Sequence, residues 1–210
     1  RLVADDPPGT GFFMDPPPGL LQPGFRAFEA SIEDLSVAFV WLMDHSEALG
    51  IDLSRVALGG YSAGAIDSLF AAYGPPQLPA AAVWANSGSL VCDANIPAFN
   101  GEAYIDGMDR EPPLVAFQGD ADLLVPFSDA QAVATRLNTY GVSHRFYTMP
   151  GEDHFYSIDT PLFTAGASGE SLEYLLACFM YQTMHLDELI PAEGEGEGEG
   201  EGEGEGEGEG

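Results

Sequence analysis

The sequence predicts an α/β fold, a parallel sheet with helices on both faces, and three observations support this prediction. Short apolar segments alternate along the chain with longer segments whose apolar residues have helical spacing, the pattern of parallel strands joined by crossover helices. A glycine-rich turn, 60–64, lies between one such strand and the helix that follows it. Polar residues suited to chemistry follow three of the strands, at the sheet edge where ligands gather in such folds.

The composition limits the classes of function. The chain has 210 residues, 45% of them apolar, which is enough for one domain with a core. It has 34 acidic residues and only six basic ones, all arginine, so the net charge is −28. This balance excludes a nucleic-acid surface, because phosphate binding needs clustered lysine and arginine. No apolar run is long enough for a membrane span. Cys92 and Cys178 form either one disulfide or two free thiols.

Three segments are expected along the chain. Proline and glycine clusters interrupt residues 1–29, which we interpret as an irregular loop segment. Residues 30–190 hold the folded core. Residues 191–210 form a Glu-Gly repeat, which predicts a disordered linker or tail because it has nothing to bury. Such a linker suggests a further domain beyond it, and favours a secreted or surface-attached protein over a cytoplasmic one.

The first predicted helix begins at Ser31, with Asp34 as its capping-box partner, and ends at Gly50. Its apolar residues form a broad face that we expect to pack against a sheet; they are Leu35, Phe39, Val40, Trp41, Leu42 and Met43. Later helices are predicted at 63–73, from Ser128 (capped with Gln131) to Gly141, and at 171–185. Strands are predicted at 56–58, 81–85, 113–117 and 144–149.

The turn from Gly60 to Gly64 fits the pattern Gly-x-Ser-x-Gly, which holds a nucleophilic serine between a strand and a helix. The turn strains the serine backbone, so the residues around it must be small. We predict Ser62 as nucleophile, the Ala63 N–H as oxyanion donor and Tyr61 as a substrate-binding residue. The alternative is a glycine-rich turn with an idle serine.

Ser62, Asp122 and His154 follow three strands in the order nucleophile, acid, base. Asp122 lies in the segment 119–126, Gly-Asp-Ala-Asp-Leu-Leu-Val-Pro, and His154 ends the segment Gly-Glu-Asp-His. Over residues 30–185 the chain resembles the α/β-hydrolase superfamily, close to the esterase and lipase group that includes the hormone-sensitive-lipase-like carboxylesterases. The resemblance implies that the chain is the C-terminal part of such a fold, with about four strands, and that residues 30–190 are part of its catalytic core.

The resemblance implies a serine hydrolase that cleaves a small-molecule carboxylic ester through an acyl-enzyme, without cofactor. Ser62 would attack the acyl carbonyl, His154 would transfer the proton and Asp122 would orient the imidazole. Asp120 is the rival acid, and its expected role is to bind loop amides. Metal binding by these acids lacks a supporting spacing such as His-Glu-x-x-His. The remaining histidines, His45, His144 and His185, are expected to be solvent or packing residues.

The His-Gly-Gly motif that supplies the second oxyanion donor in the family does not occur in this sequence. Arg1-Leu2 resembles the end of the family's fourth strand, so we expect an N-terminally truncated chain whose earlier strands lie upstream. The strand 56–58 would then be an exposed apolar edge. Two further hypotheses remain: a catalytically impaired or non-catalytic binding module with the same fold, and a peptide-cleaving relative of the prolyl oligopeptidases.

Overall fold

The computed structural model describes residues 22–75, 77–90, 101–107, 111–156 and 169–189. Four strands in these segments form one parallel sheet, and their order in the sheet, β1-β2-β3-β4, is their order along the chain. Their bounds are Ala57–Tyr61 for β1, Ala82–Asn86 for β2, Leu114–Gly119 for β3 and His144–Met149 for β4. The predicted parallel α/β sheet is confirmed.

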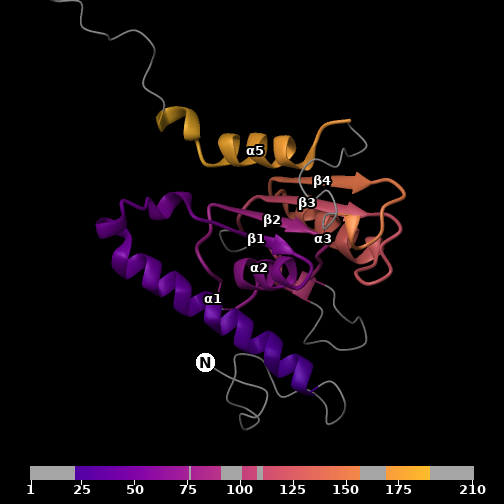
Figure 1. Cartoon of the computed structure of the whole chain (residues 1–210), viewed down its shortest axis with the longest axis horizontal. Helices are drawn as coiled ribbons and strands as arrows, with labels where there is room; N and C mark the ends of the chain where they lie inside the picture. The colour runs from indigo at the N-terminus through magenta and orange to yellow at the C-terminus, as the bar shows by residue number, and fades with distance from the viewer. Residues whose placement is uncertain (1–21, 76, 91–100, 108–110, 157–168, 190–210) are drawn as a thin grey trace, which may run out of the picture.

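Helices cover both faces of this sheet, as Figure 1 shows. On one face lie α2 (Ala63–Tyr73) and α3 (Phe127–Tyr140), and on the other lies α5 (Leu172–Thr183). The long helix α1 (Gln22–Leu49) packs along the outside of α2. Short 3₁₀ helices occur at Leu53–Arg55, Gly101–Tyr104 and Leu186–Leu189.

β3 is buried along its whole length because its side chains pack into a core on each face of the sheet. Leu114 and Ala116 belong to the core shared with α2 and α3, whereas Val115 and Phe117 belong to the core beneath α5. This alternation follows from the two-residue period of a strand. A central parallel strand that is covered on both faces therefore has a nearly continuous run of apolar residues in its sequence.

β1 has a hydrogen-bonded neighbour on one side only within the part of the chain that the structure describes. All five of its residues are half-buried, whereas four of the five residues of β2 are buried. This strand ends at the turn predicted to carry the nucleophile. A free edge at such a strand is a ready template for pairing with another chain.

The first helix departs from its prediction at its start and agrees at its end. α1 begins at Gln22, inside the segment 1–29 that was predicted to be irregular, because Pro23 falls in the first turn, where its missing N–H costs nothing. Ser31 therefore lies inside the helix, and its hydroxyl donates to the Phe28 carbonyl at 2.7 Å instead of capping. Gly50, at φ +66°, follows the last helical residue as predicted.

The predicted broad apolar face of α1 is wrong in extent, and its main partner is α2 and not the sheet. Phe39 is buried against Ala71 and Leu78, but Val40 and Trp41 are 50% and 52% exposed. A narrow stripe suffices because α1 packs mainly on the side of α2 and reaches the sheet only at its edge, where Leu58 of β1 lies against the Phe39 cluster.

Other predicted elements match the structure closely. α2 and β4 have the predicted bounds, and Ser171 caps α5 by accepting from the Tyr174 N–H at 3.2 Å. The predicted cap of α3 is wrong: Pro126 occupies the N-cap position, and the Ser128 hydroxyl donates to Asp129 at 3.2 Å. Residues 1–21, the tail 191–210 and Cys92 lie outside the described residues, and so does the choice between a Cys92–Cys178 disulfide and two free thiols.

Candidate active site

Ser62 occupies the turn between β1 and α2 in a backbone conformation that is rare for a side-chain-bearing residue. Its φ is 53° and its ψ is −120°, a strained region that persists only where the surrounding structure enforces it. Hydrogen bonds on both sides hold the turn: the Ser62 N–H donates to the Asn86 carbonyl at 2.9 Å, and the Ser62 carbonyl accepts from the Ile66 N–H at 3.0 Å.

The structure leaves no room for a side chain at the first glycine of the pattern and leaves room for one at the last. A Cβ atom on Gly60 would lie 2.7 Å from the carbonyl oxygen of Gly64 and 2.9 Å from the backbone nitrogen of Ala65, so the turn excludes it. A Cβ atom on Gly64 would meet nothing within 4 Å. The expectation that neighbouring residues must be small therefore holds at Gly60, and space alone does not require it at Gly64.

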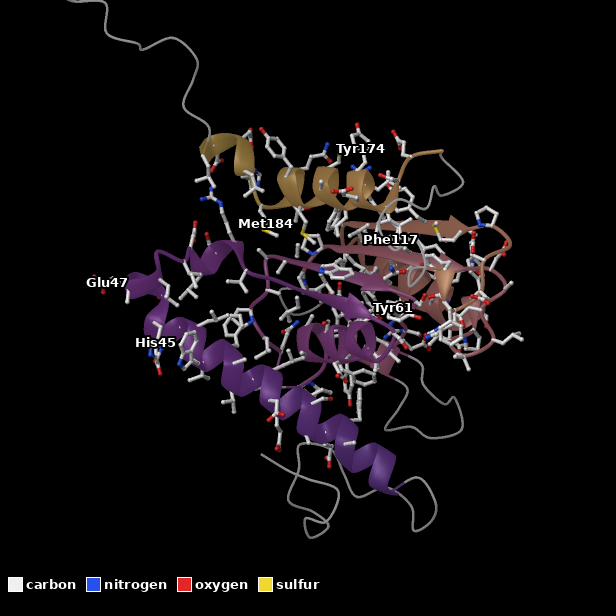
Figure 2. All side chains as sticks on the ribbon, in the orientation of Figure 1. His45, Glu47, Tyr61, Phe117, Tyr174 and Met184 are labelled. Carbon is white, nitrogen blue, oxygen red and sulfur yellow. The ribbon has the colours of Figure 1, made fainter. Side chains whose placement is uncertain are left out.

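His154 lies beside Ser62, with its Nε2 atom 2.8 Å from the Ser62 Oγ. It belongs to the loop after β4, which Gly151 enters at φ +75°, and its side chain is buried. Two hydroxyls fix the backbone of this loop by donating to the His154 carbonyl, that of Tyr61 at 2.8 Å and that of Ser87 at 3.4 Å. Figure 2 places Tyr61 at the carboxyl end of β1, where this loop arrives.

Asp122 meets the other side of the imidazole. Its Oδ2 atom lies 2.8 Å from His154 Nδ1, and its side chain has no exposed surface. The backbone N–H groups of Leu124 and Val125 donate to its Oδ1, both at 2.8 Å, and the side chain of Gln118 donates to Oδ2 at 2.8 Å. The carboxylate is thus held on both oxygens.

Asp120, the rival acid, is placed elsewhere. Its Oδ1 accepts from the Gly151 N–H at 2.7 Å, and the residue is exposed. This contact ties the loop after β3 to the loop after β4, which is the amide-binding role that the sequence predicted for it.

These contacts determine the tautomer of the His154 imidazole and the role of each of its ring nitrogens. Because a carboxylate can only accept, the neutral ring carries its proton on Nδ1 when Asp122 faces that nitrogen. Nε2 is then free to accept the Ser62 hydroxyl proton. With a hydroxyl, an imidazole and a buried carboxylate bonded in this series, the imidazole can take the hydroxyl proton while the oxygen attacks an electrophilic carbon.

Ala63 is the first residue of α2, so its N–H has no partner within the helix. The same helix end carries partial positive charge, which favours an oxyanion. Burial, with the charges of Asp122 and Asp153, raises the pKa of the Tyr61 hydroxyl, which therefore stays a neutral donor to the His154 carbonyl. The substrate-binding role of Tyr61 stays a prediction.

Sequence reasoning missed the buried polar residues behind the site. Ser87 has a positive φ of 53° and no exposed surface, and the Tyr156 hydroxyl donates to the Asn86 side chain. Burial raises the pKa of Tyr156 well above its ordinary value, which keeps this donor neutral. A signal was present for Gln118 and Asn86, since each is a polar residue at or next to the end of an otherwise apolar, largely buried strand.

The other histidines lie outside this cluster. His45 stacks on Trp41 at the far end of α1, well away from Tyr61 in Figure 2. His144 Nδ1 lies 3.0 Å from the Val142 carbonyl, and the His185 carbonyl accepts from Arg55 at 3.5 Å. Among the described residues no group of three or more His, Cys, Asp or Glu side chains could hold a metal ion, and no helix is long and apolar enough to cross a bilayer.

Comparisons of the sequence and of the structure both relate this chain to known proteins. The family model described as phospholipase/carboxylesterase matches residues 20–160. A truncated carbohydrate esterase from gut microbiota superposes with a TM-score of 0.58 at 16% identity, covering 73% of this chain and 68% of that one. Esterase 2 of Thermogutta terrifontis, phosphoramylated by tabun, gives 0.56 at 18% identity, covering 75% of this chain and 64% of its own.

A third structure is MGS-M1, an α/β-hydrolase enzyme from a Medee basin deep-sea metagenome library. It gives a TM-score of 0.53 at 18% identity, covering 83% of this chain and 70% of that one. At these identities the structures show a shared α/β-hydrolase fold. The chain spans about two thirds of the length of each of the three.

Proposed function

Because the chain belongs to the phospholipase/carboxylesterase family of α/β-hydrolases, which matches residues 20–160, we propose that it is a serine hydrolase that cleaves carboxylic esters. Ser62 is the nucleophile, His154 the general base and acid, and Asp122 the residue that orients the imidazole. The observation that carries this proposal is the pair of 2.8 Å contacts that join the Ser62 hydroxyl to His154 and His154 to Asp122.

The reaction proceeds in two halves. In the first, Ser62 Oγ attacks the ester carbonyl carbon while His154 Nε2 takes the hydroxyl proton, and the tetrahedral intermediate then expels an alkoxide that receives this proton from His154. In the second, His154 deprotonates a water molecule that attacks the acyl-enzyme, and the acid product leaves as Ser62 regains its proton. The charge of Asp122 stabilises the imidazolium that forms in each half.

The oxyanion binds at the start of α2. The Ala63 N–H donates to the carbonyl oxygen as negative charge develops there, and the positive end of the helix adds to this stabilisation. We propose that a second donor comes from a loop outside the described residues, in the role of the family's His-Gly-Gly loop. Loss of one such donor costs about 10²–10³ in rate.

The proposed substrate is a small-molecule carboxylic ester, and the proposed reaction uses no cofactor. Placement among the hormone-sensitive-lipase-like carboxylesterases remains a prediction, because the family model and the solved structures identify the wider esterase group.

The test is turnover of p-nitrophenyl acetate by the complete protein and its Ser62→Ala variant. We expect the variant to lose about 10⁴-fold or more in kcat. Ser68→Ala is the matched control, because Ser68 lies on α2, six positions after Ser62, and is buried with its hydroxyl donating to the Gly64 carbonyl at 2.7 Å. Unchanged turnover in Ser62→Ala would end the proposal.

Labelling by a fluorophosphonate probe separates the esterase from a non-catalytic binding module. Stoichiometric labelling that depends on Ser62 excludes the binding module, whereas a folded protein that resists the probe supports it. A p-nitroanilide assayed beside the ester tests the third hypothesis, peptide cleavage, because Ser62-dependent release of p-nitroaniline requires cleavage of an amide bond.

A further inference from the structure

Gln118 is the last side chain of β3 before its terminal glycine, and it lies wholly buried beside Asp122. The residue has no exposed surface. Its Nε2 atom donates to two acceptors, Asp122 Oδ2 at 2.8 Å and the Val125 carbonyl at 2.9 Å. These two bonds use both hydrogens of the amide group.

The bond from Gln118 falls on the carboxylate oxygen that also meets His154. Oδ2 of Asp122 therefore faces two donors, Gln118 Nε2 and His154 Nδ1. Oδ1 faces two others, the backbone N–H groups of Leu124 and Val125. Rotation of the carboxylate would break bonds on both oxygens, so its plane is set from opposite sides.

The carbonyl oxygen of the same amide lowers the stability of the folded protein. The Oε1 atom of Gln118 is buried and has no hydrogen-bond partner among the described residues, which is unfavourable for folding. Turning the amide over would not help, because Oε1 would then face two acceptors. An apolar side chain of the same length would avoid this cost, so packing alone does not account for a glutamine here.

We propose that Gln118 is a positioning residue for ester hydrolysis: its amide holds Asp122 so that Oδ2 keeps the His154 ring directed at Ser62. The inference rests on the proposed function, and it assigns Gln118 no contact with substrate. A neutral donor suits this position. It orders the carboxylate and leaves its negative charge to stabilise the imidazolium, whereas an arginine or lysine would neutralise that charge.

Two variants at this position test the inference in the complete protein. Gln118→Met keeps the length of the side chain and removes the donor. We expect kcat for p-nitrophenyl acetate to fall about tenfold to a hundredfold, the loss that follows removal of the hydrogen-bond partners that orient metal-binding side chains, with KM within about twofold. Gln118→His places an N–H donor at the same number of bonds from Cα, so we expect it to restore most of kcat and of the fluorophosphonate labelling rate.

Val133→Ala is the control for a purely structural effect, because Val133 is buried on α3 and packs in the core shared by α2 and the sheet. We expect it to lower Tm and leave kcat unchanged. The inference is overturned if Gln118→Met keeps the wild-type kcat, if its loss appears in KM alone, or if Gln118→His loses as much kcat as Gln118→Met. Failure of the proposed function looks different, because wild-type protein would then show no Ser62-dependent labelling.

Discussion

The Ser62 Oγ and the His154 Nε2 lie 2.8 Å apart although 92 residues separate them in the chain. β1 and β4 stand at opposite sides of the described sheet, so the loop after β4 must cross the carboxyl ends of the strands between them. Along its path the loop bonds to residues at or just after the ends of the other strands. The Glu152 carbonyl accepts from the Ala121 N–H at 3.0 Å, and the His154 carbonyl accepts from the hydroxyls of Ser87 and Tyr61. The loop after β4 therefore brings His154 across the sheet edge to Ser62, which lies in the turn after β1, and to Asp122, which lies in the loop after β3.

Asp122→Asn should reduce kcat by up to about 10⁴-fold, because an amide facing His154 Nδ1 favours the wrong tautomer. Asp120→Asn is the matched control, since Asp120 contacts the Gly151 N–H and not the imidazole. Steady-state kinetics on p-nitrophenyl acetate measure both. Similar losses in the two variants would contradict the assignment of Asp122 as the acid.

Tyr61→Phe should reduce kcat about fivefold with little change in KM. The change removes a hydroxyl that holds the His154 backbone, and a hydrogen bond of this kind contributes about 1 kcal/mol. The sequence-based prediction that Tyr61 binds substrate requires the opposite split, a raised KM with kcat preserved. Ser87→Ala, which removes the longer 3.4 Å bond to the same carbonyl, should have the smaller effect.

Gly60→Ala should destabilise the protein by about 1–3 kcal/mol, because its methyl group would press on the backbone of Gly64 and Ala65. Gly64→Ala should be neutral or stabilising by up to about 1 kcal/mol, because its methyl group meets nothing within 4 Å and alanine favours a helix. Urea unfolding followed by circular dichroism measures both free energies. Equal destabilisation by the two changes would show that the turn does not have the packing described here.

Asp67→Asn should raise Tm at neutral pH and lose this advantage in acid. Asp67 is half-buried on α2, and burial raises its pKa above 3.8, with the Ser31 hydroxyl acting in the opposite direction. The folded state thus holds this proton more tightly than the unfolded state. Its contribution to stability is complete below pH 3.8 and is lost as the pH rises through the folded value. Thermal unfolding across the acid range tests this, and a difference in Tm that grows toward low pH would contradict it.

How far the sequence predicts the structure can be judged element by element. The bounds of α2 and β4 follow from local pattern, because both begin and end at residues with strong local preferences, such as the turn at Ser62 and Gly141 ahead of β4. The start of α1 does not, because a proline in the first turn is compatible with a helix as well as with a loop. Nor does the narrow buried stripe of α1, since the sequence does not state whether a helix will meet a sheet or the side of another helix.

By itself, the order of residues determined that this chain forms a parallel α/β sheet and which side chains, Ser62, Asp122 and His154, reach its carboxyl edge. Strand period, turn glycines and motif spacing are local properties, and they carry that information. Only the tertiary structure decided that Gln118 and Tyr61 support those side chains and that Asp120 ties two loops together. Such contacts depend on distances between residues far apart in the chain, and those distances exist only once the loop after β4 has crossed the sheet.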